Sequence, residues 1–155
     1  MSTKMFAAVV SALSALALVA AETHTVNFYN NCGYGTPVLR SQSGEVLSQG
    51  EDYTSDGALD GAIAYLQTGG CGGNGEGCTL VELTLTNGWS SADISLISPH
   101  EFSVTSGFGY WNGCDNTGTD CSSTDCGQAF HNSDDNVVQV GCSADDVNLA
   151  ITFCD

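Results

Sequence analysis

The chain has 155 residues and a strongly acidic composition, with 18 Asp and Glu residues against two Lys and Arg residues and a formal net charge of −16 at pH 7. Such a charge makes nucleic acids and anionic membrane surfaces poor partners, because both are polyanions. A neutral polysaccharide or a cation is compatible with it.

Residues 1–21 have the pattern of a secretion signal peptide. Lys4 supplies the positive start, residues 6–20 form an apolar run, and small residues precede a cleavage point before Glu22. We therefore expect one mature domain over residues 22–155, which is long enough for a modest hydrophobic core. No later apolar stretch reaches membrane-spanning length, so we expect no membrane insertion.

The eight cysteines favour disulfides, because thiols in a secreted chain are normally oxidised in pairs. Eight cysteines allow many connectivities, and spacing alone does not select one. The spacings lack the paired two-residue gaps of zinc sites, and the Asp-rich turns lack the pattern of a calcium-binding hand. The chain also has no phosphate-binding glycine loop. We expect four disulfides, no metal and no cofactor.

Strand patterns dominate the chain, and no convincing amphipathic helix occurs. Apolar and polar residues alternate in four stretches, at 26–29, 81–85, 93–96 and 149–153. Glycine-rich segments with Asn-Gly and Gly-Gly pairs, at 68–78 and 112–121, predict turns. Many short strands separated by such turns indicate an all-β sandwich or barrel.

Six blocks of this sequence resemble successive segments of the thaumatin-like protein family. They are NFYNNCGYGTPV (27–38), SGEVLSQGEDYT (43–54), TLVELTLT (79–86), SADISLI (91–97), EFSV (101–104) and VNLAITFCD (147–155). The blocks occur in family order, and the chain most resembles the small secreted thaumatin-like proteins of fungi, which lack the disulfide-rich second domain of the large members. The resemblance implies an all-β, thaumatin-like β-sandwich stapled by four disulfides.

The resemblance also implies how the cysteines pair. In the family a disulfide joins the two termini, and a cysteine after the EFSV-like strand pairs with one ahead of the last strand. A disulfide that closes the longest loop, between Cys32 and Cys154, also removes the most entropy from the unfolded chain. In the chain-entropy model it stabilises the folded state by about 4 to 5 kcal/mol. The expected pairs are Cys32–Cys154 and Cys114–Cys142, which leaves Cys71–Cys78 and Cys121–Cys126 as local pairs.

Members of the family carry an acidic cleft, built from an arginine, a glutamate and several aspartates. It is associated with β-1,3-glucan binding and, in some members, with weak glucanase activity. By local match Glu82 takes the place of the glutamate and Asp93 that of the first aspartate. Ser98 stands at the second aspartate, with Glu101 as the nearest carboxylate, and the arginine position falls near Tyr65. The resemblance thus implies an incomplete cleft that lacks its cation.

Glu82 and Asp93 are the candidate catalytic residues. A glycosidase needs two carboxyl groups about 5 to 9.5 Å apart, with one of them kept protonated. Both residues lie in alternating stretches, so they could share one face of a sheet. Three interpretations stay open: both side chains simply point to solvent, they bind a sugar, or they hydrolyse it.

Aromatic side chains provide a second route to carbohydrate, because their rings stack on the apolar face of a sugar. The candidates for substrate binding are Trp89, Trp111 and Tyr110, together with Glu101. Trp89 lies in a glycine-bordered turn and is expected to be exposed, whereas a core position is the alternative for Tyr110. The three histidines are expected at the surface.

These observations predict a secreted protein, extracellular or associated with the cell wall, that binds cell-wall β-1,3-glucan and has a possible defence or antifungal role. The alternative of a different class is an extracellular elicitor, allergen or immunomodulatory protein that is recognised by a host-cell receptor. The second alternative is a weak endo-β-1,3-glucanase that uses Glu82 and Asp93.

Overall fold

The computed structural model describes residues 21–135 and 139–155. The predicted signal peptide, apart from its last residue, lies outside the described residues. The described residues form twelve β-strands, and none of them lies in a helix that could cross a membrane.

One sheet has five strands in the order β4-β1-β12-β8-β9. Their bounds are Tyr53–Asp56 (β4), Thr23–Asn30 (β1), Asn148–Phe153 (β12), Ser106–Trp111 (β8) and Gly118–Cys121 (β9). The strands β1 and β12, from the two ends of the described chain, are parallel neighbours at its centre. The other pairs in this sheet are antiparallel.

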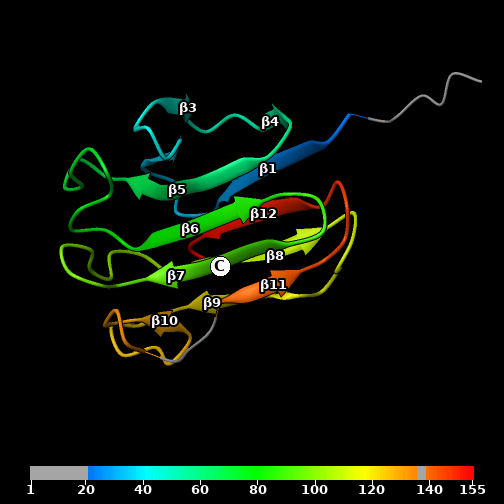
Figure 1. Ribbon diagram of the computed structural model, residues 1–155. Helices are drawn as coiled ribbons and strands as arrows, with labels where there is room; N and C mark the ends of the chain where they lie inside the picture. The colour runs from blue at the N-terminus through cyan, green and yellow to red at the C-terminus, as the bar shows by residue number, and fades with distance from the viewer. Residues whose placement is uncertain (1–20, 136–138) are drawn as a thin grey trace, which may run out of the picture.

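The second sheet has seven strands, with the order β10-β7-β6-β5-β2-β3 and with β11 also paired to β7. Their bounds are Ala129–Phe130 (β10), Ser90–Ser95 (β7), Leu80–Leu85 (β6), Leu59–Gln67 (β5), Thr36–Arg40 (β2), Val46–Ser48 (β3) and Val140–Cys142 (β11). Ala129 pairs with Ile94, and Val140 pairs with Ala92. The two short strands therefore pair with the same edge of β7, one on each side of Asp93 along the strand. Figure 1 shows both of them below β7.

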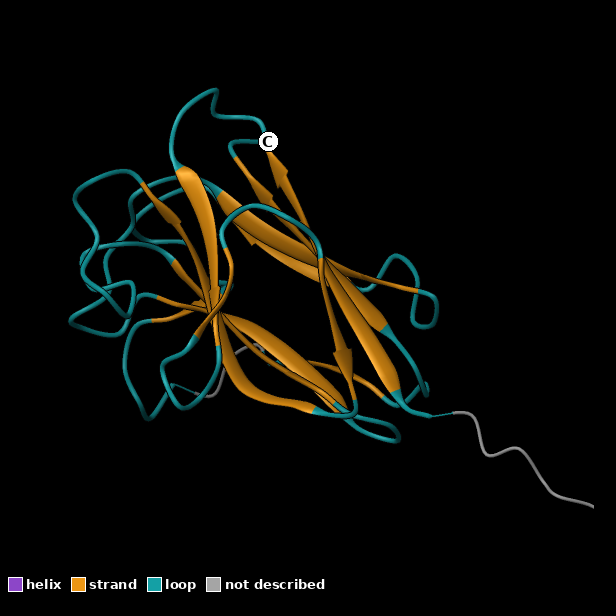
Figure 2. Cartoon of the chain, turned by 90° about the horizontal axis from the view of Figure 1, so that it is seen from above, coloured by secondary structure: helices purple, strands orange, loops and turns teal. Residues whose placement is uncertain are grey.

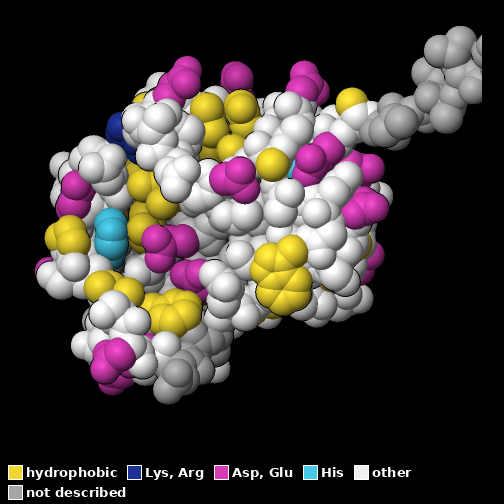
Figure 3. All heavy atoms as spheres, in the orientation of Figure 1, with side chains coloured by type: hydrophobic (Ala, Val, Ile, Leu, Met, Phe, Trp, Pro, Cys, Tyr) yellow, Lys and Arg dark blue, Asp and Glu magenta, His cyan; other side chains and the backbone are white. Residues whose placement is uncertain are grey.

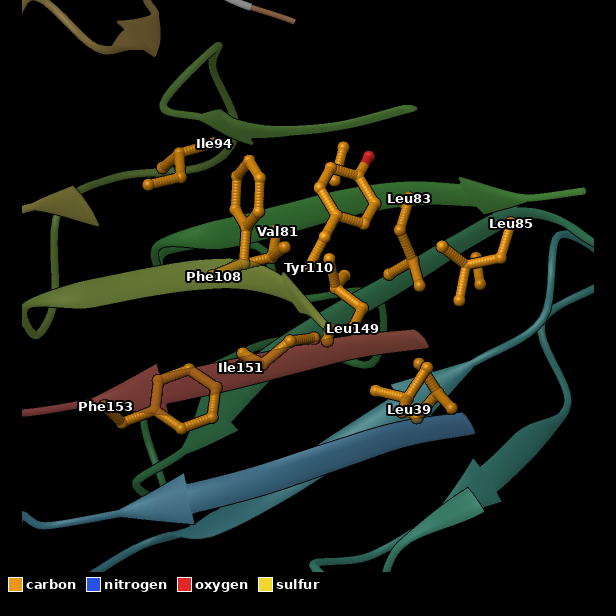
Figure 4. Packing of buried hydrophobic residues seen from close by; sticks show 14 of the residues in the cluster. Leu39, Val81, Leu83, Leu85, Ile94, Phe108, Tyr110, Leu149, Ile151 and Phe153 are labelled. Carbon is orange, nitrogen blue, oxygen red and sulfur yellow. The ribbon is translucent and has the colours of Figure 1, made fainter. Parts of the chain in front are cut away.

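The two sheets form the two layers of a sandwich, seen from above in Figure 2. Alternate residues of both sheets point into the space between them and form one core. Figure 4 shows this packing, with Val81 and Leu83 from one sheet and Leu149 and Ile151 from the other. The alternation predicted strands β1, β6, β7 and β12, and the structure confirms all four together with the all-β sandwich.

Four disulfides staple this sandwich, and they are the pairs expected from the resemblance: Cys32–Cys154, Cys71–Cys78, Cys114–Cys142 and Cys121–Cys126. The first follows the parallel strands β1 and β12 and has a sequence separation of 122. The second closes the glycine-rich loop at 68–78. This loop covers part of the outer face of the seven-stranded sheet, where Tyr65 donates a hydrogen bond to the carbonyl oxygen of Gly73 at 2.8 Å.

The sequence predicts a turn for the glycine-rich segment 112–121, but its last four residues form strand β9. Pairing with β8 supplies the hydrogen bonds for this strand, and Cys121 is fully buried. Tertiary pairing thus overrides the local turn pattern.

The expectation that all three histidines lie at the surface is wrong for His24, which is fully buried. Its Nδ1 lies 2.6 Å from the carbonyl oxygen of Val147, and its Nε2 lies 3.0 Å from Oε1 of Glu22. Both neighbouring oxygens can accept a hydrogen bond from a ring N–H. Burial is tolerated because both ring nitrogens have partners.

Candidate functional site

Glu82 and Asp93 are direct cross-strand partners on the antiparallel strands β6 and β7. Partners in such a pair point to the same face of the sheet. Because Val81, Leu83, Ala92 and Ile94 point into the core, the two carboxylates lie on the outer face of the seven-stranded sheet. Figure 3 shows acidic side chains gathered near the middle of this face.

The acid pair lines a hollow of about 210 Å³ on this face. The other lining residues come from β5, β6 and β7 and from the residue that precedes β11; they are Gly61, Ala62, Ile63, Leu83, Thr84, Ser91 and Gln139. The hydroxyls of Thr84 and Ser91 and the amide of Gln139 thus lie among apolar residues in the lining around the two carboxylates. Such a lining can both donate and accept hydrogen bonds.

Asp93 is the unusual member of the pair, because it is only 6% exposed. Its Oδ2 accepts a hydrogen bond from Nε2 of Gln139 at 3.3 Å, whereas its Oδ1 is buried and has no hydrogen-bond partner among the described residues. Burial, with a smaller contribution from the charge of Glu82, raises the pKa of Asp93 to about 6. The interpretation in which both carboxylates simply point to solvent is therefore wrong for Asp93.

Arg40 shares a row of cross-strand partners with this pair, since Arg40 is opposite Ile63 and Ile63 is opposite Glu82. Its guanidinium, however, donates to the carbonyl oxygens of Gly44 and Gly73 rather than to a carboxylate. In the described parts of the chain, no cationic side chain pairs with Glu82 or Asp93. The position of Arg40 escaped the sequence analysis because the register of β2 against β5 is a tertiary feature.

Trp89 lies on the same face as the acid pair and is 63% exposed. Gly141 of β11 pairs with Ser91, two residues before Asp93, so its outer side belongs to this face. A Cβ atom at Gly141 would lie 3.3 Å from Cη2 of Trp89, so the indole lies over the backbone of Gly141. The turn that carries the indole is held by two hydrogen bonds between the backbone of Thr86 and the Ser90 hydroxyl. One edge of the hollow therefore continues toward an exposed aromatic ring.

Tyr110 lies in the core, which was the alternative for this residue. It is 3% exposed, its ring meets Phe108 edge to face, and its hydroxyl donates to the carbonyl oxygen of Val140 at 2.8 Å. Burial also raises the pKa of the Tyr110 phenol. The expectation that Tyr110 stacks on a sugar is wrong for this structure, because its ring is enclosed between the sheets.

Trp111 and Glu101 are exposed, but the structure does not bring them to the acid pair. Trp111 follows the inward-pointing Tyr110 on β8, so it lies on the outer face of the other sheet. The backbone N–H of Glu101 donates to the carbonyl oxygen of Cys78, and Glu101 does not line the hollow. Of the predicted site residues, only Glu82, Asp93 and Trp89 lie on one face.

Two kinds of residue at the hollow were missed by the sequence analysis. Thr84 and Ser91 lie two residues from Glu82 and Asp93, and the period-two rule could have found them. Gln139 belongs to no motif and reaches Asp93 only because β11 pairs with β7. The described residues contain no group of three or more His, Cys, Asp or Glu side chains suited to hold a metal ion.

Comparison with known proteins gives a match of structure rather than of sequence. No family model matches the chain, and no curated protein matches its sequence significantly. A solved structure described as that of the thaumatin-like xylanase inhibitor TLXI is similar with a TM-score of 0.54, covering 85% of this chain and 99% of that chain. The protein has a thaumatin-like fold. The sequence identity to that structure is 17%, so the likeness concerns the fold alone.

Proposed function

We propose that this protein is secreted and binds β-1,3-glucan of cell walls at the hollow beside Glu82 and Asp93, with a role in defence. The observation that carries the proposal is the cross-strand pair Glu82 and Asp93 in a surface hollow that is also lined by Thr84, Ser91 and Gln139. Hydrogen bonds to charged groups contribute about 1.5 to 3 kcal/mol, so a ligand with several hydrogen-bond donors is stabilised beside these carboxylates. Sugar hydroxyls are such donors.

The size of the hollow supports recognition of a polymer from one side. Cavities that enclose a small molecule have volumes of about 300 to 1,000 Å³. The hollow of about 210 Å³ is smaller and lies on a sheet face. It suits the edge of one sugar within a longer chain, which leaves the neighbouring sugars free to contact the surrounding surface.

Secretion is supported by chemistry as well as by the predicted signal peptide. Four disulfides are present in a chain of 155 residues, and bridges of this density belong to oxidising compartments. An extracellular or wall-associated location would also bring the protein to its proposed ligand.

A weak endo-β-1,3-glucanase is the second candidate, because the two carboxyl groups have different environments. Cross-strand partners have Cβ atoms about 4.5 to 5.5 Å apart, which is compatible with the short carboxyl separation of retaining enzymes. Asp93, whose pKa is raised to about 6, would act as the acid, and Glu82 would act as the nucleophile.

A third candidate is an interaction protein, such as an elicitor, allergen or immunomodulatory protein with a host-cell receptor. The structurally similar protein is a xylanase inhibitor, so this fold occurs in a protein whose named role is directed at another protein. A shared fold is compatible with that class of function without requiring it.

Retention on insoluble β-1,3-glucan tests these candidates, with chitin and cellulose as comparison polymers and released reducing sugar measured in the supernatant. We expect retention on β-1,3-glucan that Glu82→Gln and Asp93→Asn weaken and Trp111→Ala leaves unchanged. Sugar release that disappears in both carboxyl variants would support the hydrolase. Absence of retention on every polymer would reject the glycan proposal in favour of a protein partner.

A further inference from the structure

The acid pair differs from an ordinary sugar-binding carboxylate in having negative charge without a described counter-ion. Arg40 donates to two carbonyl oxygens, and the ring of His24 lies 3.0 Å from Glu22, which precedes β1, and not beside the acid pair. Asp93 has only an amide donor, from Gln139, on one of its two oxygens. The formal net charge of −16 adds a negative field around the whole chain.

Charge complementarity therefore selects among glycans. A glycan of uronic acids or phosphates is repelled by this face. A neutral sugar offers one hydrogen per hydroxyl and no charge, whereas an ammonium group offers three hydrogens and a positive charge. Charge-assisted hydrogen bonds are roughly twice as strong as neutral ones, and they compensate a buried carboxylate most completely.

A second observation extends the site beyond the acid pair. The indole of Trp89 lies over Gly141, and more than half of Trp89 remains exposed on the same face. Ser91, which lines the hollow, is the cross-strand partner of Gly141 and so connects the two features. An exposed ring next to a polar hollow suits a chain of sugars, in which one unit meets the acids and another stacks on the ring.

We propose that the outer face of the seven-stranded sheet binds a polymer of amino sugars beside the acid pair. Glu82 and Asp93 hold the ammonium group of one glucosamine unit, and a neighbouring sugar ring stacks on Trp89. This inference rests on the proposed glycan-binding function and adds polymers of amino sugars to β-1,3-glucan as ligands of the same site. In it Glu82 and Asp93 provide the preference for an amine, and Trp89 provides affinity for any sugar ring.

Calorimetric titration of the mature, oxidised protein separates these contributions. The ligands are oligomers of β-1,4-linked glucosamine, their N-acetylated counterparts and oligomers of β-1,3-linked glucose, all at pH 5.5 and constant ionic strength. We expect the glucosamine oligomer to bind at least about tenfold more tightly than its N-acetylated counterpart, which corresponds to one charge-assisted hydrogen bond. The same titration in two buffers with different ionisation heats should show proton release only for the glucosamine oligomer, because the ammonium group displaces the proton on Asp93.

Four variants distinguish a built site from diffuse attraction to an acidic protein. Glu82→Gln and Asp93→Asn should each abolish the preference for the amine. The double variant Glu51→Gln/Asp52→Asn removes two exposed acids between β3 and β4, and its affinity should stay within about twofold of the parent because long-range charges are screened. Trp89→Ala should weaken all oligomers about tenfold and keep the preference, since ring stacking ignores the amine.

The other possible outcomes of these titrations contradict the amino-sugar inference alone or together with the proposed function. Equal affinity for the glucosamine and N-acetylated oligomers, or equal losses in the Glu51/Asp52 variant and the acid-pair variants, would overturn the amino-sugar inference. Tight binding of the glucose oligomer alone, lost in Glu82→Gln, would overturn it as well and leave the proposed function standing. Binding of none of the three oligomers would overturn both. Thermal unfolding of every variant shows that a loss of binding is not a loss of fold.

Discussion

Asp93 is opposite Glu82 across β6 and β7, and its charge is disfavoured by burial and by that neighbour. The pKa of Asp93 is raised from 3.8 to about 6 in the folded protein. Between these two values the folded state holds a proton that the unfolded state has lost, so this residue makes the protein less stable as the pH rises through that window.

The first prediction is that Asp93→Asn stabilises the protein at pH 8 and not at pH 3.5. The expected gain at pH 8 is about 3 kcal/mol, because the variant never carries the buried charge. Denaturant unfolding of both proteins at the two pH values measures it. A gain of the same size at pH 3.5 would show that the effect comes from packing rather than from ionisation.

The second prediction concerns Gly141, whose backbone lies beneath Trp89. Gly141 is not among the residues with positive φ, so a side chain there causes no backbone strain. In Gly141→Leu the new side chain occupies the place of the indole, and we expect red-shifted Trp89 fluorescence and weaker glycan retention. Trp111→Phe as the background isolates the signal of Trp89. Gly127→Leu is the matched control, since a Cβ there meets no atom within 4 Å.

The third prediction compares the longest and the shortest disulfide loops. Replacing Cys32 and Cys154 by serine should cost about 5 kcal/mol of unfolding free energy, against about 2 kcal/mol for Cys121 and Cys126, because the sequence separations are 122 and 5. Denaturant unfolding of the two double variants measures the difference. Equal losses would contradict the loop-entropy explanation.

The fourth prediction concerns His24, whose ring nitrogens face Val147 and Glu22 inside the sandwich. His24→Ala should destabilise the protein by about 2 to 4 kcal/mol, because it leaves a cavity and removes partners from two acceptors. Glu22 also accepts a hydrogen bond from the backbone N–H of Asn87 at 2.6 Å, so the β6–β7 turn should become more mobile. Hydrogen exchange at Asn87 checks this effect. Half-buried His100 is the control, and His100→Ala should cost about 1 kcal/mol.

Much of the fold could be predicted from short-range patterns. Alternation at Val81–Leu85 and Leu149–Phe153 identified strands and their apolar faces, and the glycine-bordered turn identified Trp89 as exposed. Such patterns work because successive side chains on a strand point to opposite faces, whichever strand lies alongside. The disulfide pairs came from family resemblance and not from spacing.

The alternation could not predict the environment of an individual polar residue. His24 and Asp93 are polar residues, and both are buried, His24 on the same side of β1 as Val26 and Asp93 on the outer face of its sheet. Their burial depends on partners far along the chain, Val147 for His24 and Gln139 for Asp93. For Tyr110, the local pattern was compatible with both a core and a surface position.

The sequence by itself determined the class of the domain, its charge and the four alternating strands β1, β6, β7 and β12, because these depend on composition and on a period of two residues. That Glu82 and Asp93 share one face was decided by the pairing of β6 with β7. Only the tertiary structure decided that β11 lies beside β7, which brings Gln139 to Asp93 and Gly141 beneath Trp89. The physical reason is that pairing between distant strands depends on the packing of the whole sandwich, and no local pattern records it.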